Sequence, residues 1–139
     1  MIYTFYSFKG GVGRTMALAN VAELFYRTGL RVLMVDWDLE APGLERFFFS
    51  ETQMEQILGM PGLIDMLQGY KEQMSREWSV SSNGAESLPL VPPERFVQNV
   101  HSDPSGRGRL WILTAGRRCK EHYAEYAEGV LSFDWKELY

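Results

Sequence analysis

Apolar and polar positions along the chain follow two different periods, which predict alternating strands and helices. Three short apolar runs, at 2–7, 31–36 and 109–114, are typical of buried strands. Between the first two runs, apolar side chains recur at helical spacing over residues 14–28. Strands that alternate with helices predict an α/β fold, with an open, mostly parallel sheet and helices on both faces.

The remainder of the chain carries weaker signals. The patterns predict a short helix at 42–50, one or two helices over 61–77, an edge strand at 95–100, and helices at 119–129 and 132–138. Residues 79–93 hold Ser, Asn, Gly and three of the six prolines, which indicates a loop or insertion. The length of 139 residues suits one modest domain over residues 1–139.

Composition excludes several classes of protein. Hydrophobic residues make up 45% and charged residues 23%, which is ordinary globular material. The single cysteine, Cys119, cannot form a disulfide framework within the chain. No apolar run is long enough for a membrane span, and Met1 leads straight into a predicted strand without a signal peptide. We therefore expect a cytoplasmic protein.

Charge bears on one possible partner. The net charge of −4 argues against a nucleic-acid surface over the whole molecule. The candidate for a local basic patch is the group Arg107, Arg109, Arg117, Arg118 and Lys120. Such a basic turn at the end of a strand is more typical of a solvated loop, so nucleic acid is an improbable partner without being excluded.

The strongest chemical signal is the glycine-rich string Lys9-Gly10-Gly11-Val12-Gly13-Arg14-Thr15, between the first strand and the first helix. In such a turn the backbone N–H groups converge on one centre, to which the helix N-terminus adds partial positive charge. Glycines let the backbone approach an anion closely, and Thr15 stands where a phosphate loop needs a hydroxyl for Mg²⁺. The alternative interpretation is a glycine-rich turn without a ligand.

A pair of acids, Asp36 and Asp38, follows the second predicted strand. In an open α/β sheet the ligand lies beyond the carboxyl ends of the strands. Two carboxylates at this place suit a magnesium ion and an attacking water. Alternatively, the acids cap the turn that follows them, because Asp is common in turns.

The glycine-rich string resembles the deviant Walker A motif, K-G-G-V-G-K-[ST], of the MinD/ParA family of P-loop ATPases, which belongs to the SIMIBI class. Against the general P-loop pattern, Phe8 stands at the first glycine and Arg14 at the lysine, and the latter resembles the branch with Arg in place of the second lysine. The segment with Asp36 and Asp38 resembles the family's D-x-D. The run from Arg109 to Gly116 resembles its strand that ends in a small-residue turn, so the resemblance extends along the whole chain.

The resemblance implies binding of ATP and Mg²⁺. The cofactor-binding residues would be Gly10, Gly11, Val12, Gly13, Arg14 and Thr15. Thr15 and Asp36 would serve the metal, Asp36 through water, while Asp38 would orient the water that attacks the γ-phosphate. Lys9 would reach across an ATP-dependent homodimer to the phosphates of the partner.

Three functions fit this resemblance. The first is an ATP-driven dimerisation switch, a weak ATPase that recruits an unidentified protein partner. The second is a nucleotide-binding signalling module without significant hydrolysis, and the third is a domain like the bacterial tyrosine kinases. No Walker B strand is evident after residue 116, so we expect an N-terminal portion of a longer ATPase that hydrolyses ATP when the full domain is present.

Overall fold

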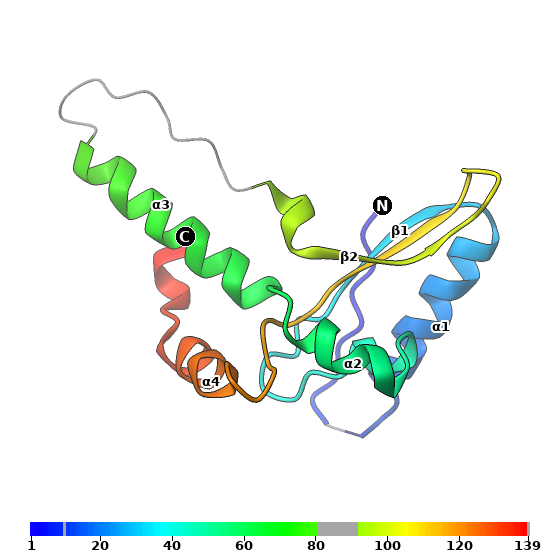
Figure 1. The fold of residues 1–139 in the computed structure, drawn as a ribbon, viewed down its shortest axis with the longest axis horizontal. Helices are drawn as coiled ribbons and strands as arrows, with labels where there is room; N and C mark the ends of the chain where they lie inside the picture. Colours follow the sequence, from blue (N-terminus) through cyan, green and yellow to red (C-terminus); the bar gives the residue numbers. More distant parts are fainter. Residues whose placement is uncertain (10, 81–91, 139) are drawn as a thin grey trace.

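The computed structural model describes residues 1–9, 11–80 and 92–138, and Figure 1 shows their arrangement. The α-helices are α1 (Arg14–Arg27), α2 (Glu51–Leu58), α3 (Leu63–Val80) and α4 (Tyr123–Ser132). The strands are β1 (Arg31–Val35), β2 (Val97–Ser102) and β3 (Arg109–Leu113). Three short 3₁₀ helices complete the described elements: η1 (Leu44–Phe47), η3 (Pro93–Arg95) and η4 (Trp135–Leu138).

The three strands form an open sheet in the order β1-β3-β2. β1 and β3 are parallel, with Arg31 opposite Arg109 and Val35 opposite Leu113. β2 is antiparallel to β3 and has an irregular register beside Asn99. The strands expected at 31–36, 95–100 and 109–114 are therefore present, and the expected α/β class with an open sheet is confirmed.

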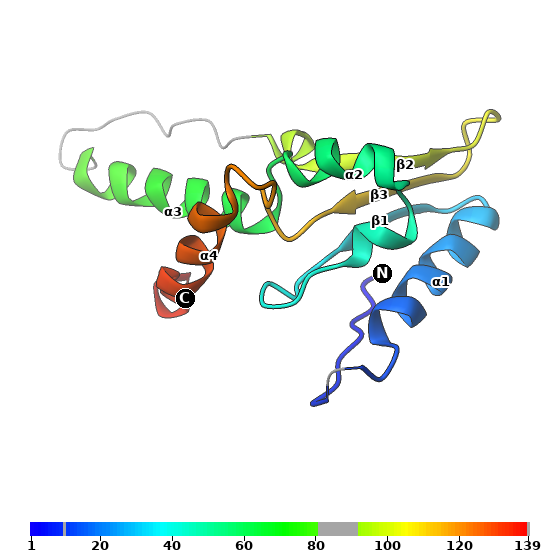
Figure 2. The ribbon, with the colours of Figure 1, turned by 60° about the horizontal axis from the view of Figure 1, so that its bottom comes forward.

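α1 packs on one face of the sheet (Figure 2). Ala19 and Ala22 of this helix meet Met34 of β1 and the fully buried Leu110 and Ile112 of β3. Alternate residues of a strand point to opposite faces, so these strand residues define the face toward α1. The small alanine side chains let the helix axis approach the sheet closely, which places the start of α1 near the strand ends.

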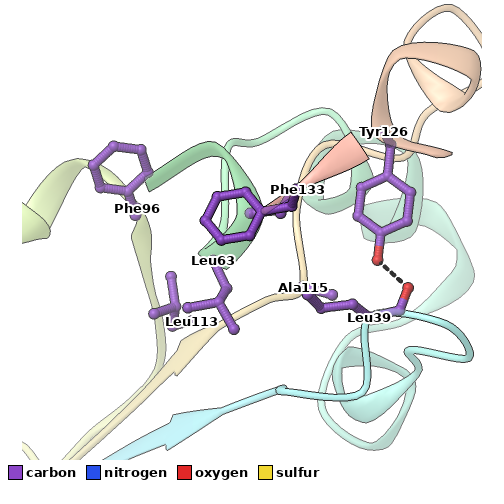
Figure 3. Close-up of a cluster of buried hydrophobic side chains, with 8 residues drawn as sticks. Leu39, Leu63, Phe96, Leu113, Ala115, Tyr126 and Phe133 are labelled. Atoms are coloured by element: carbon purple, nitrogen blue, oxygen red, sulfur yellow. Dashed lines mark hydrogen bonds between the residues drawn. The ribbon is translucent and has the colours of Figure 1, made fainter. Parts of the chain in front are cut away.

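The opposite face is covered where β3 ends. Leu113 lies there in a cluster with Leu63 and Ile64, which begin α3 (Figure 3). The backbone N–H groups of Leu63 and Ile64 donate to the carbonyls of Thr114 and Ala115, at 2.8 and 3.0 Å. α3 and α4 thus attach to the segment that follows β3, beyond the carboxyl ends of the parallel strands.

Most of the predicted helices are present. The helix expected at 14–28 is confirmed as α1, and the pattern over 61–77 gives a single helix, α3, that continues to Val80. The short helix expected at 42–50 is only a 3₁₀ turn, η1, and the α-helix α2 follows it. Of the loop expected at 79–93, residues 81–91 lie outside the described residues.

The strand expected at 2–7 is wrong. Residues 1–7 have no regular secondary structure, and Ile2 and Tyr6 are 93% and 72% exposed. The central strand β3 already pairs on both sides, with β1 and β2. An interior strand needs neighbours and cover on both faces, so an apolar run alone does not make one.

Gly116 permits the close packing behind the sheet and provides a test of it. Its φ is +154°, and a Cβ there would lie 2.5 Å from Ile64 Cγ2 and 2.9 Å from Tyr126 Cε2. We expect Gly116→Ala to lower the free energy of unfolding by about 1–3 kcal/mol, because the core is overpacked. Urea unfolding measures this change. The matched control is Gly69→Ala in α3, where a Cβ meets nothing within 4 Å; it should not destabilise the protein, and equal losses in both variants would contradict the packing argument.

Candidate functional site

The glycine-rich loop turns sharply into α1. Gly11 and Gly13 have φ values of +73° and +78°, in the left-handed region that favours glycine. Gly13 is the N-cap of α1, and no side chain caps the helix. The N–H groups of the first turn of a helix have no partner within the helix, so they face the loop. Gly10 of this loop lies outside the described residues.

Arg14 connects this loop to the segment that follows β1, residues 36–41, which we call the acidic turn. Its Nη2 donates to Asp38 Oδ2 at 2.5 Å, and Nη1 donates to the Ser7 carbonyl at 3.4 Å. The side chains of Arg14 and Asp38 are 28% and 32% exposed, so the ion pair is only partly screened by water. The structure therefore brings together two predicted site residues that lie far apart in the sequence.

Asp36 is buried and organises the turn that it begins. Its Oδ1 accepts the N–H of Asp38 at 3.2 Å, and its Oδ2 accepts those of Gly43 and Leu44 at 3.0 and 3.1 Å. Asp38 Oδ1 likewise accepts the Ala41 N–H at 3.1 Å. Both acids thus cap the turn, as the alternative interpretation expected. A carboxylate offers about four acceptor positions, so Asp36 retains capacity for one further donor such as a water molecule.

The other predicted site residues lie around the loop. Thr15 is half-buried in the first turn of α1, whereas Val12 and Lys9 are exposed. The Lys9 carbonyl accepts the Ser7 hydroxyl at 2.9 Å. In the described part of the chain the Lys9 ammonium makes no ion pair, so it is available to a group outside the chain.

Sequence reasoning missed the residues that hold the acidic turn from behind. Glu45, 1% exposed, forms an ion pair with Arg118, whose side chain is 8% exposed, at 3.1 Å. The Tyr126 hydroxyl donates to the Leu39 carbonyl at 2.6 Å. The interpretation of the basic group as a solvated loop is wrong for Arg118, because this guanidinium is buried against Glu45 of η1, the 3₁₀ helix that follows the acidic turn.

Three features of this site are typical of the phosphate-loop nucleotide-binding domains. They are left-handed glycines at the start of a helix, a cation next to them in the chain, and acids directly after a parallel strand. A model of the CobQ/CobB/MinD/ParA nucleotide binding domain matches residues 3–108, and the chain belongs to this family. No curated protein and no solved structure gives a significant match. None of the described helices has both the length and the apolar character needed to cross a membrane.

Proposed function

We propose that the chain binds ATP with Mg²⁺ at residues 10–15 and acts as an ATP-driven dimerisation switch with weak hydrolysis. The observation that carries this proposal is the position of Arg14. Arg14 is the first residue of α1, directly after the left-handed Gly13, and its guanidinium pairs with Asp38. A cation and a helix N-terminus at one place both favour a phosphate group.

The surroundings of the loop fit a phosphate chain. A Cβ at Gly11 would meet nothing within 4 Å, so the space beside the loop is open. Arg14 is engaged by one carboxylate, Asp38, and a phosphate offers it a similar pair of oxygens. When Arg14 turns to a phosphate, Asp38 is released and can orient a water molecule.

The donor set also fits Mg²⁺ held mainly by the nucleotide. The described residues contain no group of three or more His, Cys, Asp or Glu that could hold a metal ion by themselves. Mg²⁺ is usually bound by one or two protein groups together with phosphates and water. The Thr15 hydroxyl would supply a direct ligand, and the buried Asp36 carboxylate would accept a hydrogen bond from a metal-bound water. The bound ion neutralises charge on the phosphates.

Exposed apolar side chains around the loop support dimerisation. Phe8, Val12 and Met16 are 94%, 59% and 54% exposed. Apolar side chains gathered next to a charged site are typical of an interaction surface. In the proposed homodimer these side chains would be buried, and Lys9 would reach the phosphates of the partner; the protein partner that reads the switch is a further expectation.

The second candidate is a nucleotide-binding signalling module without significant hydrolysis. The Arg14–Asp38 pair favours it, because the proposed water-orienting acid is neutralised by the cation of the phosphate loop. The two candidates differ in whether nucleotide binding separates this pair. Phosphate release from ATP by the purified chain distinguishes them. Release above background supports the weak ATPase, and its absence supports the signalling module.

Thr15→Ala tests the metal-dependent part of the proposal. Loss of one metal-site group typically costs about 10- to 100-fold in metal affinity, so the variant should bind a non-hydrolysable ATP analogue at least tenfold more weakly in Mg²⁺. Isothermal titration calorimetry measures the affinity. In EDTA the variant and the parent chain should bind equally, and an equal loss with and without Mg²⁺ would contradict a magnesium role for Thr15. A folded parent chain that binds no nucleotide would overturn the proposed function.

Lys9→Ala is the matched variant for dimerisation. At protein concentrations too low for dimerisation it should bind the analogue with the parent affinity, because Lys9 is exposed and acts on the partner. It should stay monomeric in sedimentation runs in which the nucleotide-bound parent chain dimerises.

A further inference from the structure

We infer that Tyr126 is a positioning residue of the nucleotide site, because its hydroxyl holds the turn that presents Asp38 to Arg14. This inference rests on the proposed function. It connects α4, an element outside the phosphate loop and the acidic turn, to the group that competes with phosphate for Arg14.

The contact itself is short and buried. The Tyr126 hydroxyl donates to the Leu39 carbonyl at 2.6 Å (Figure 3), and both residues are 8% exposed. Burial raises the pKa of Tyr126 to about 12, so the hydroxyl retains its proton at any physiological pH. A buried carbonyl that loses such a donor pays the cost of desolvation, so the bond selects the position of Leu39.

The Tyr126 ring cannot move away easily. It packs on Gly116, where even a Cβ would lie only 2.9 Å from the ring. On another side the Arg118 guanidinium lies 5.8 Å from the ring centre, and Arg118 is itself paired with Glu45. The ring therefore provides a fixed point behind the turn.

The turn has few hydrogen bonds to the rest of the molecule, and it is otherwise held by packing of the Leu39 side chain in the buried cluster and of the Trp37 ring near Trp135. Its internal hydrogen bonds join Asp38 to Asp36, Leu39 to Trp37 and Ala41 to Asp38. Asp36, at the start of the turn, is held by the Leu113 carbonyl and by the N–H groups of Gly43 and Leu44. For residues 37–41, the hydrogen bonds to other described segments are those of Arg14 to Asp38 and of Tyr126 to Leu39. Loss of the Tyr126 bond removes the restraint on the Leu39 carbonyl and leaves only side-chain packing there, so Asp38 can take more positions and its hold on Arg14 weakens.

The first test is amide hydrogen exchange of the full chain by NMR. In Tyr126→Phe, which keeps the ring, the Asp38 and Ala41 amides should exchange about fivefold faster, as expected from one lost hydrogen bond. Amides of α1 and β1 should keep their rates. The matched control is Tyr123→Phe, an exposed tyrosine of the same helix, whose ring lies 6.5 Å from that of Tyr126; it should leave the turn unchanged. Unchanged rates in the turn, or a uniform increase over the whole chain, would overturn the inference.

The second test asks whether Tyr126 acts through Asp38. Asp38→Asn removes the charge that competes with phosphate, so it should tighten binding of the non-hydrolysable ATP analogue with Mg²⁺. Tyr126→Phe should tighten it in the same direction, by about threefold, and should change nothing further in the Asp38→Asn background, because two residues that act as one unit are not additive. Equal shifts in both backgrounds, or no shift in the parent chain, would contradict the inference. Absence of binding in all four proteins would refute the proposed function, and the exchange rates would still decide the role of Tyr126 in the turn.

Discussion

Arg118→Met should lower the free energy of unfolding by about 3–5 kcal/mol, because it leaves a buried carboxylate without its partner. Glu45 is 1% exposed and lies 3.1 Å from the Arg118 guanidinium. Arg118 also donates from Nε to the Gly116 carbonyl at 3.3 Å. The methionine side chain retains much of the apolar volume, so the loss reports mainly the charge.

Urea unfolding followed by circular dichroism measures this loss. Lys120→Met is the matched control, because Lys120 is an exposed cation two residues away; we expect a change within about 0.5 kcal/mol. The double variant Glu45→Leu with Arg118→Met should recover most of the stability, since an apolar pair often replaces a buried ion pair without loss. A single variant as stable as the parent chain would show that the Glu45–Arg118 pair contributes little.

The second large effect concerns nucleotide binding. Arg14→Ala should weaken binding of the ATP analogue with Mg²⁺ by about 10- to 100-fold, because hydrogen bonds to a charged group contribute about 1.5–3 kcal/mol. In the variant no Arg14–Asp38 pair has to be broken on binding, and the expected loss is what remains after that saving. Isothermal titration calorimetry at fixed ionic strength measures the affinity.

Two further variants isolate the position of the charge. Arg46→Ala removes an exposed arginine from the end of η1, near the acidic turn, and should keep the parent affinity. Arg14→Lys keeps a cation at the site and should retain a substantial part of the affinity, although it loses the planar fork. An affinity of Arg14→Ala equal to that of Arg46→Ala would exclude Arg14 from the phosphate site.

Local pattern predicted the elements that carry the loop and the acids. The helix of residues 14–28 has the 3.6-residue period, and the strands of β1 and β3 are short apolar runs, so each could be predicted from its own residues. The placement of Asp36 and Asp38 after a strand brought them toward the glycine-rich loop. The ion pair between Arg14 and Asp38 is the outcome of that placement.

One missed element had a signal in the sequence. Ser50 and Gln53 form a capping box at the start of α2, with the Ser50 N–H donating to Gln53 at 3.1 Å. The pattern S-x-x-Q before a helical segment is a known start signal. It would have placed a helix after residue 50 instead of over 42–50.

The contacts behind the acidic turn had no such signal. Glu45 lies in the run Leu44-Glu-Arg-Phe47, where nothing distinguishes a buried acid from an exposed one. Arg118 meets Glu45 of η1, and Tyr126 meets Leu39 of the acidic turn, only through tertiary packing. Tyr126 and Leu39 are 87 residues apart. Periodicity describes one element at a time, so it cannot predict which distant side chain completes a hydrogen bond.

The Tyr126–Leu39 contact joins two segments that the ribosome makes at different times. The phosphate loop and the acidic turn emerge early, whereas the tyrosine that holds the turn is added 87 residues after Leu39. Contacts between segments far apart in the sequence form slowly, since the long loop between them must first close. The nascent chain therefore contains the phosphate loop before the turn that carries Asp38 is held in place. The site reaches its final geometry only when α4 docks on that turn.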